Sequence, residues 1–183
     1  RKTADEQFVC SLSPINGYYI FKKGSSIQLT KNFWSYEFDC HGSGCCTETK
    51  ISAKLVQLCQ QIRDHFGTSV SISSPYSCPA RNSSTPNAAT NSRHTKGDAA
   101  DIVVSGHAPR EVAAYCESIG ILGIGLYETS SDGFFVHIDV RDYKSFWYGQ
   151  ACAARTTFGG TSVATATPAT ATTSNSVLSS GSR

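Results

Sequence analysis

The stretch GFFVHIDVR, residues 133–141, alternates in the way that is typical of a β-strand, whose successive side chains point to opposite faces. One face carries only apolar side chains, at positions 134, 136, 138 and 140. The other face carries Phe135, His137, Asp139 and Arg141. A strand that serves only packing does not need histidine, aspartate and arginine in succession on one face. We therefore interpret the first face as part of the core and the second as the floor of a functional site.

A second stretch, SRHTKGDAADIVV at residues 92–104, supplies two more candidates for that site. It places His94 on a loop, seven positions before Asp101, which opens a predicted strand. The glycine between them permits an unusual backbone angle, and the two alanines before Asp101 let neighbouring elements approach. If this strand pairs with the strand that contains His137, the two histidines and the aspartate come together.

Two imidazole nitrogens and one carboxylate oxygen form a donor set that suits zinc, and three protein ligands leave a fourth position open for water. A hydrolytic zinc requires that open position, because the metal polarises a carbonyl and lowers the pKa of water toward ~7. In the alternative interpretation, His137 is a hydrogen-bonded core residue and Asp101 only forms a turn. The spacing alone leaves both interpretations open.

The rest of the chain shows helices and strands without a regular βαβ rhythm, which predicts an α+β fold. Apolar residues recur with helical periodicity over residues 47–65, with Gly67 placed to end that helix. A second helix is expected over residues 108–120. Residues 17–29 are expected to form a short hairpin or a single leading strand. The remaining strands are expected at residues 69–74, 101–105, 123–127 and 134–140, and a loop at 78–91.

The length of 183 residues suits one ordinary domain with some chain left over. We expect an N-terminal extension over residues 1–28, the domain over 29–152, and a disordered tail or linker over 153–183. The end of this tail is almost entirely Thr, Ala and Ser, which cannot offset the entropy of ordering. The net charge of +2, without a basic run, argues against a nucleic-acid partner. No apolar stretch approaches the roughly 20 residues of a membrane helix, and a monomer is expected.

Cysteines are the most informative part of the composition. The eight lie at Cys10, Cys40, Cys45, Cys46, Cys59, Cys78, Cys116 and Cys152. Their even number, and a chain without methionine that fits removal of a signal peptide, predict a secreted protein braced by disulfides. The alternative is a structural zinc site in CHGSGCC, which offers Cys40, His41, Cys45 and Cys46.

Several motifs together resemble one family. SRHTKGDAAD matches the pattern SxHxxGxAxD of the zinc D-alanyl-D-alanine peptidases, and GIGLY, FFVHIDVR and FWYG look like the downstream half of that family. With NFWSYEFDC and SISSPYSCPARN upstream, the similarity runs from Leu29 to Gly149 and is best in the short, single-domain branch. The resemblance implies a Hedgehog/DD-peptidase fold, an antiparallel sheet with helices packed on one side. It also implies that His94, Asp101 and His137 bind Zn²⁺ and that the substrates are peptidoglycan stem peptides, cleaved often beside D-alanine.

The chain departs from the family where many members have Ser-Gly-Tyr-Arg, because Ser-Pro-Tyr-Ser stands at residues 74–77 instead. The family's arginine is associated with the carboxylate of the substrate. We expect Tyr76 to contact the substrate and another arginine to supply the charge, through a bidentate bond. The candidates are Arg81, Arg93 and Arg141, each of which is otherwise an ordinary surface arginine. Carboxypeptidase and endopeptidase action both stay open.

The general base is a second departure. Some relatives carry glutamate three residues before the final histidine, where this chain has Phe134, and others carry a second histidine at the position of Phe135. Asp139 lies two residues after His137 on the same face and is expected to be the base, with Asp132 on the preceding turn as the second candidate. The alternative role of Asp139 is to orient a ligand imidazole, and that of Asp132 is to form the turn.

Three hypotheses for the function follow. The first is a secreted zinc peptidase that acts on bacterial cell-wall peptides, with Asp139 or Asp132 activating the attacking water. The second is a zinc-containing binding or signalling module of the same fold that does not catalyse, which the missing glutamate, second histidine and Tyr-Arg pair favour. The third is a disulfide-rich structural domain without a metal.

Overall fold

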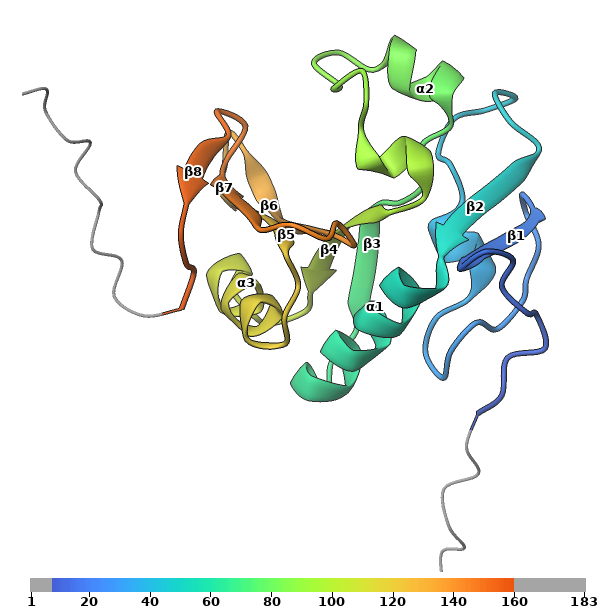
Figure 1. The fold of residues 1–183 in the computed structure, drawn as a ribbon, viewed down its shortest axis with the longest axis horizontal. Helices are drawn as coiled ribbons and strands as arrows, with labels where there is room; N and C mark the ends of the chain where they lie inside the picture. Colours follow the sequence, from blue (N-terminus) through green and yellow to red (C-terminus); the bar gives the residue numbers. More distant parts are fainter. Residues whose placement is uncertain (1–7, 160–183) are drawn as a thin grey trace, which may run out of the picture.

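A six-stranded sheet forms the centre of the computed structural model, which describes residues 8–159 (Figure 1). The strand order is β3-β4-β6-β5-β7-β8. The strands are β3 (Val70–Ser74), β4 (Ala99–Val104), β5 (Gly123–Thr129), β6 (Gly133–Asp139), β7 (Ser145–Tyr148) and β8 (Ala153–Arg155). Together with the helices this confirms the α+β class.

The sheet is mixed, whereas a wholly antiparallel sheet was expected. All neighbouring strands are antiparallel except β5 and β7, which run parallel with Gly123 opposite Ser145. The reason is geometric. Strand β6 ends level with the first residue of β5, since Asp139 pairs with Gly123. The chain then crosses the start of β5, so the next strand can only run back in the same direction as β5.

Two helices, α1 (Ala53–Phe66) and α3 (Pro109–Ser118), lie on the same side of this sheet (Figure 1). They share one hydrophobic core with the apolar side chains of β6, in which Val136 and Ile138 are almost completely buried. Helix α1 ends before Gly67, as the sequence predicts, and Gly67 adopts the left-handed conformation that closes a helix.

The first helix begins later than its periodicity predicts. Residues Glu48–Ser52 form strand β2, because this segment alternates between buried and exposed residues before the helical pattern takes over. Strand β2 pairs antiparallel with β1 (Tyr18–Lys22) in a separate two-stranded sheet, so residues 17–29 contain a strand but not a self-contained hairpin. Ser52 caps α1, since its Oγ accepts a hydrogen bond from the backbone N–H of Leu55 at 3.2 Å.

Short helical segments occupy regions outside the two long helices. The expected loop at residues 78–91 contains α2 (Pro79–Ser84), and two 3₁₀ turns, η1 (Ser35–Phe38) and η2 (Arg93–Lys96), precede β2 and β4. Proline at the first position of α2 favours a helix there, because it has no N–H to leave unpaired. None of the helices in residues 8–159 is long and apolar enough to cross a membrane.

The domain boundaries of 29 and 152 stay predictions, and the folded core has contributions from both sides of them. Tyr19 and Phe21 of β1 are buried in the common core. At the other end β8 pairs with β7, and Phe158 is buried against Phe146. The Thr/Ala/Ser segment from Thr161 onward lies outside the described residues.

A matched pair of substitutions in β6 tests the assignment of Ile138, but not Phe134, to the core. We expect Ile138→Ala to lower the free energy of unfolding by about 2–5 kcal/mol, because Ile138 is fully buried and its loss leaves a cavity. Phe134 shares that face but is 58% exposed at the strand's start, so Phe134→Ala should cost about 1 kcal/mol or less. Urea unfolding measures both, and equal losses would contradict the assignment.

Candidate metal centre

Three side chains from separate elements meet at one point of the sheet. Strands β4 and β6 are neighbours, and their register places Asp101 directly opposite His137. The Nδ1 atom of His137 lies 3.0 Å from Oδ1 of Asp101. His94, on η2, places its Nε2 atom 3.4 Å from the same oxygen. One donor atom from each residue lies within 4.8 Å of the other two, so the structure brings together the three residues that the sequence singled out.

The loop that carries His94 turns sharply just before β4. Gly97 has a φ of 75°, and a Cβ at this position would lie only 2.3 Å from the carbonyl oxygen of Lys50. Any larger residue would push η2 away from β2. The glycine therefore serves both the turn and the close approach of the two segments.

The second nitrogen of each histidine already has a hydrogen-bond partner. His94 Nδ1 lies 3.0 Å from the carbonyl oxygen of Pro75, which can only accept, so Nδ1 is the donor in this contact. His137 Nε2 lies 2.8 Å from Oδ2 of Asp139. These contacts orient both rings with His94 Nε2 and His137 Nδ1 directed at Asp101. Such outer partners are typical of metal-binding histidines.

Asp139 is a buried support for His137. It is 1% exposed, and its carboxylate accepts hydrogen bonds from Arg141 Nε at 2.7 Å and from Nη2 at 2.6 Å. Gly123 on β5 makes room for it, because a Cβ there would lie 2.0 Å from Oδ1 of Asp139. These contacts fit the alternative role foreseen for Asp139, that of orienting an imidazole. Its role as general base stays a prediction.

The charges in the centre stabilise one another. Burial raises the pKa of Asp101, but the hydrogen bonds from His137 and His94 outweigh it and lower the pKa to about 2. For His137, burial lowers the pKa, whereas Asp101 and Asp139 together raise it to about 9. Burial also raises the pKa of Asp139, and the contacts with His137 and Arg141 bring it well below the usual range. In the metal-free protein, Asp101 and Asp139 thus stabilise the positive charge of protonated His137, and the same surroundings suit a cation.

Trp147 forms a wall beside His137 that sequence reasoning missed. Its ring lies 4.9 Å from the imidazole, centroid to centroid, and its Nε1–H donates to the hydroxyl of Tyr127 at 2.9 Å. Gly125 permits this packing, because a Cβ at that position would lie 2.5 Å from the indole ring. In the sequence, only the second glycine of GIGLY hints at this packing. The glycine matters because β5 pairs with β7, the strand that carries Trp147.

A cleft of about 260 Å³ opens next to His94 and Asp101. Of the predicted substrate residues, Tyr76 and Arg81 line it, whereas Arg141 is engaged by Asp139. His41 and Asn82 also line the cleft, and sequence reasoning did not place either of them there. The remaining lining residues are mostly small or polar: Ser73, Ser74, Pro75, Ser77, Thr85, Ala88 and Ser92.

Arg93 does not line the cleft and lies near the same buried carboxylate as Arg141. Its Nε atom is 3.9 Å from Oδ1 of Asp139, and its Nη2 donates to the Tyr143 hydroxyl at 3.2 Å. The ring of Tyr143 also lies below the guanidinium of Arg141. These two arginines therefore balance the charge of Asp139, which leaves Arg81 as the candidate arginine that lines the cleft.

Asp132 lies at the turn between β5 and β6, away from the triad. Its Oδ2 accepts a hydrogen bond from Thr129 Oγ1 at 3.0 Å, and its Oδ1 accepts one from the backbone N–H of Gln150 at 3.2 Å. The distance to His137 along the strand is five residues, or roughly 16 Å. Its contacts are those of a turn former, and its predicted catalytic role stays a prediction.

All eight cysteines lie in the described part of the chain, and each has a free thiol, so disulfide bracing stays a prediction. Four of them gather at a second potential metal-binding position, formed by Cys40, Cys45, Cys46 and Cys78. The expected alternative set contained His41 in place of Cys78. His41 lines both the cleft and the cavity beside the cysteines but is not a member of the cluster. A contact between distant loops brings Cys78 to the other three thiols instead.

The comparison with known families matches this site. The sequence model of the family described as Peptidase M15 matches residues 28–139, which include all three residues of the triad. The chain belongs to the peptidase M15 family. Its members are zinc-dependent metallopeptidases. Searches of curated proteins and of solved structures found no match. The donor set of His94, Asp101 and His137 fits zinc on its own chemistry, with two neutral-nitrogen donors and one carboxylate.

Substituting the two predicted catalytic aspartates, Asp139 and Asp132, one at a time distinguishes their roles in zinc binding. We expect Asp139→Asn to weaken zinc binding about 10–100-fold, because the amide no longer stabilises the orientation and basicity of His137. Asp132→Asn is the matched control and should leave the affinity unchanged. Competition with a chromogenic chelator measures both constants. An unchanged affinity in Asp139→Asn would contradict the supporting role.

The raised pKa of His137 predicts how stability changes with pH in the metal-free protein. The folded state holds this proton more tightly than the unfolded state, in which the pKa is about 6.5. The resulting stabilisation, on the order of 3 kcal/mol, is complete below that value and is lost as the pH rises through about 9. Thermal unfolding of metal-free protein should show this loss, and His137→Gln should not. Parallel curves for the two proteins would refute the prediction.

Proposed function

We propose that the chain is a zinc peptidase that hydrolyses peptide bonds in peptidoglycan stem peptides or cross-links. One observation carries this proposal. Two imidazole nitrogens and a carboxylate oxygen converge beside an open cleft, while the other nitrogen of each ring is already bonded to Pro75 or Asp139. Among residues 8–159 no fourth protein ligand joins these three donors, which is the pattern of a catalytic rather than a structural zinc. Membership of the peptidase M15 family supports the same conclusion.

In this proposal each element of the chain has a defined task. When bound, zinc supplies a Lewis acid that polarises the scissile carbonyl and makes water more acidic. His94, Asp101 and His137 hold the ion, and the Asp139–Arg141 pair keeps the His137 ring in place. Trp147 covers one side of that ring and limits the access of bulk water there.

The cleft would receive the substrate peptide. Arg81 at its wall can bind a substrate carboxylate through charge-assisted hydrogen bonds, and Tyr76 can contact the neighbouring backbone. A free C-terminal carboxylate at Arg81 would make the enzyme a carboxypeptidase acting beside D-alanine. A side-chain carboxylate or a cross-link there would make it an endopeptidase. An extracellular location belongs to the proposal, because peptidoglycan lies outside the bacterial membrane.

A second candidate function is a zinc-containing binding module that does not catalyse. Phe134 and Phe135 support it, because they stand where some relatives carry the catalytic glutamate or a second histidine. Phe135 stacks on Tyr127 with a ring separation of 4.2 Å, which makes that part of the site floor aromatic. An aromatic floor suits binding, but it offers no group to accept a proton from water.

Digestion of purified peptidoglycan distinguishes the two functions. The zinc-loaded chain should release muropeptides with newly cleaved bonds, and mass spectrometry identifies the bond. His94→Ala should reduce the rate at least 100-fold, because the metal loses one of three ligands. His107→Ala is the matched control and should keep full activity, because His107, just before α3, contacts Glu111 within that helix and does not line the cleft. Zinc-loaded protein that binds peptidoglycan but cleaves nothing would select the binding module.

A further inference from the structure

We propose that Cys40, Cys45, Cys46 and Cys78 form a second zinc site, a structural centre of four thiolates that fixes one wall of the cleft. It is separate from the triad, contains no histidine and does not depend on the proposed peptidase activity. One Sγ atom from each cysteine lies within 4.8 Å of the other three. Four sulfur donors in tetrahedral array are the usual ligand set of structural zinc.

The separations between the sulfur atoms match a metal better than disulfides. Sγ of Cys45 lies 3.6 Å from Sγ of Cys40 and 4.0 Å from Sγ of Cys46. A tetrahedron with Zn–S distances of about 2.3 Å has edges of about 3.8 Å. A disulfide would require about 2.05 Å, so each bond would need a movement of well over an ångström. The sulfur of Cys45 is also close to two others at once, an arrangement that two separate bridges would not need.

The four thiols come from two loops that are far apart in the sequence. Cys40 follows η1, Cys45 and Cys46 precede β2, and Cys78 directly precedes α2. Cys40 and Cys78 are each 2% exposed, whereas the other two are partly accessible. An ion bound by all four sulfur atoms would account for their convergence in a region without strands or long helices.

Backbone groups already point at the sulfur atoms. The N–H of Cys78 donates to Sγ of Cys40 at 3.4 Å, and the N–H of Arg81 donates to Sγ of Cys78 at 3.4 Å. Such hydrogen bonds stabilise the negative charge of metal-bound thiolates. Gly42 lets the loop wrap around Cys45, since a Cβ at Gly42 would lie 2.3 Å from that sulfur atom.

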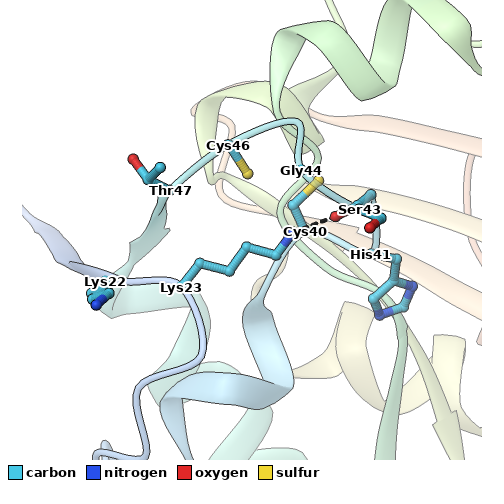
Figure 2. Close-up of a pocket in the computed structure, with 9 residues that line it drawn as sticks. Lys22, Lys23, Cys40, His41, Ser43, Gly44, Cys46 and Thr47 are labelled. Atoms are coloured by element: carbon cyan, nitrogen blue, oxygen red, sulfur yellow. Dashed lines mark hydrogen bonds between the residues drawn. The ribbon is translucent and has the colours of Figure 1, made fainter.

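The surroundings offer positive charge and an access route for the ion. Four thiolates and one Zn²⁺ leave a net charge of −2, and Lys22, Lys23 and His41 line the adjoining cavity of about 570 Å³. Figure 2 shows Lys23 extending toward the loop, where its ammonium group donates to the carbonyl of Gly42, with Cys40 and Cys46 nearby. The cavity gives solvent, and thus a metal ion, a path to the partly accessible thiols.

The site would connect directly to the cleft. His41 follows Cys40 in the chain, Tyr76 lies two residues before Cys78, and Arg81 lies three residues after it. All three line the cleft beside the triad. An ion that joins these loops would therefore hold the cleft wall in position, in the way that a disulfide would, but with four attachment points.

Metal analysis and cobalt spectroscopy of the full chain, prepared under reducing conditions, test the proposal. We expect two zinc ions per chain. After exchange with Co²⁺, a sulfur-to-cobalt charge-transfer band should appear, which the triad cannot produce because it contains no sulfur. His137→Ala should lose one zinc and keep the band. The double variant Cys45→Ser/Cys46→Ser should lose the band and one zinc, and the exposed Cys152→Ser should change neither.

The outcomes separate this site from the proposed peptidase function. If the chain shows the cobalt–thiolate band but no peptidase activity, the failure lies with the triad alone and the four-thiolate site stands. Absence of the band in the wild-type chain would overturn the four-thiolate site, and so would iron in place of zinc. The same holds if Cys40, Cys45, Cys46 and Cys78 resist alkylation in a separate preparation that is purified and denatured without reductant, because they are then bridged to one another. The measurements on the wild-type chain do not depend on whether any variant folds.

Discussion

The register between β4 and β6, which sets Asp101 opposite His137, is the constraint on which the candidate centre depends. A slip of one residue would turn every side chain of β6 to the other face, and His137 would point into the core. The register is held by the apolar side chains of the same strand, since Val136 and Ile138 are buried among α1 and α3. The hydrophobic core therefore positions the charged cluster, although the two lie on opposite faces of one sheet.

Small residues make that cluster possible at close range. Gly123 leaves space for the carboxylate of Asp139, and Gly125 leaves space for the ring of Trp147. Both lie on β5 directly across from β6, so one neighbouring strand accommodates the group behind His137 and the ring beside it. The charges then compensate one another, because the carboxylate of Asp139 contacts both an imidazole and a guanidinium. A buried aspartate without these partners would destabilise the fold.

The structure contains two donor sets of different chemistry. The triad offers nitrogen and oxygen ligands and keeps one side open toward the cleft, as a site for chemistry requires. The four-cysteine cluster offers only sulfur and supplies four donors, as a site for structural support requires. His41, Tyr76 and Arg81 line the cleft together with His94 and Asp101, and they lie close to Cys40 or Cys78 in the sequence. The shape of the cleft would thus depend on both positions.

The sequence by itself determined the faces of β6, the end of α1 at Gly67 and the family, because these follow from local periodicity, from single-residue conformational preference and from ordered motifs. It also indicated that His94, Asp101 and His137 belong together. Only the tertiary structure decided that Cys78 joins the other three thiols, that Pro75 orients His94 and that residues 48–52 are a strand. These features depend on which distant segments touch, and no periodicity along the chain records such contacts.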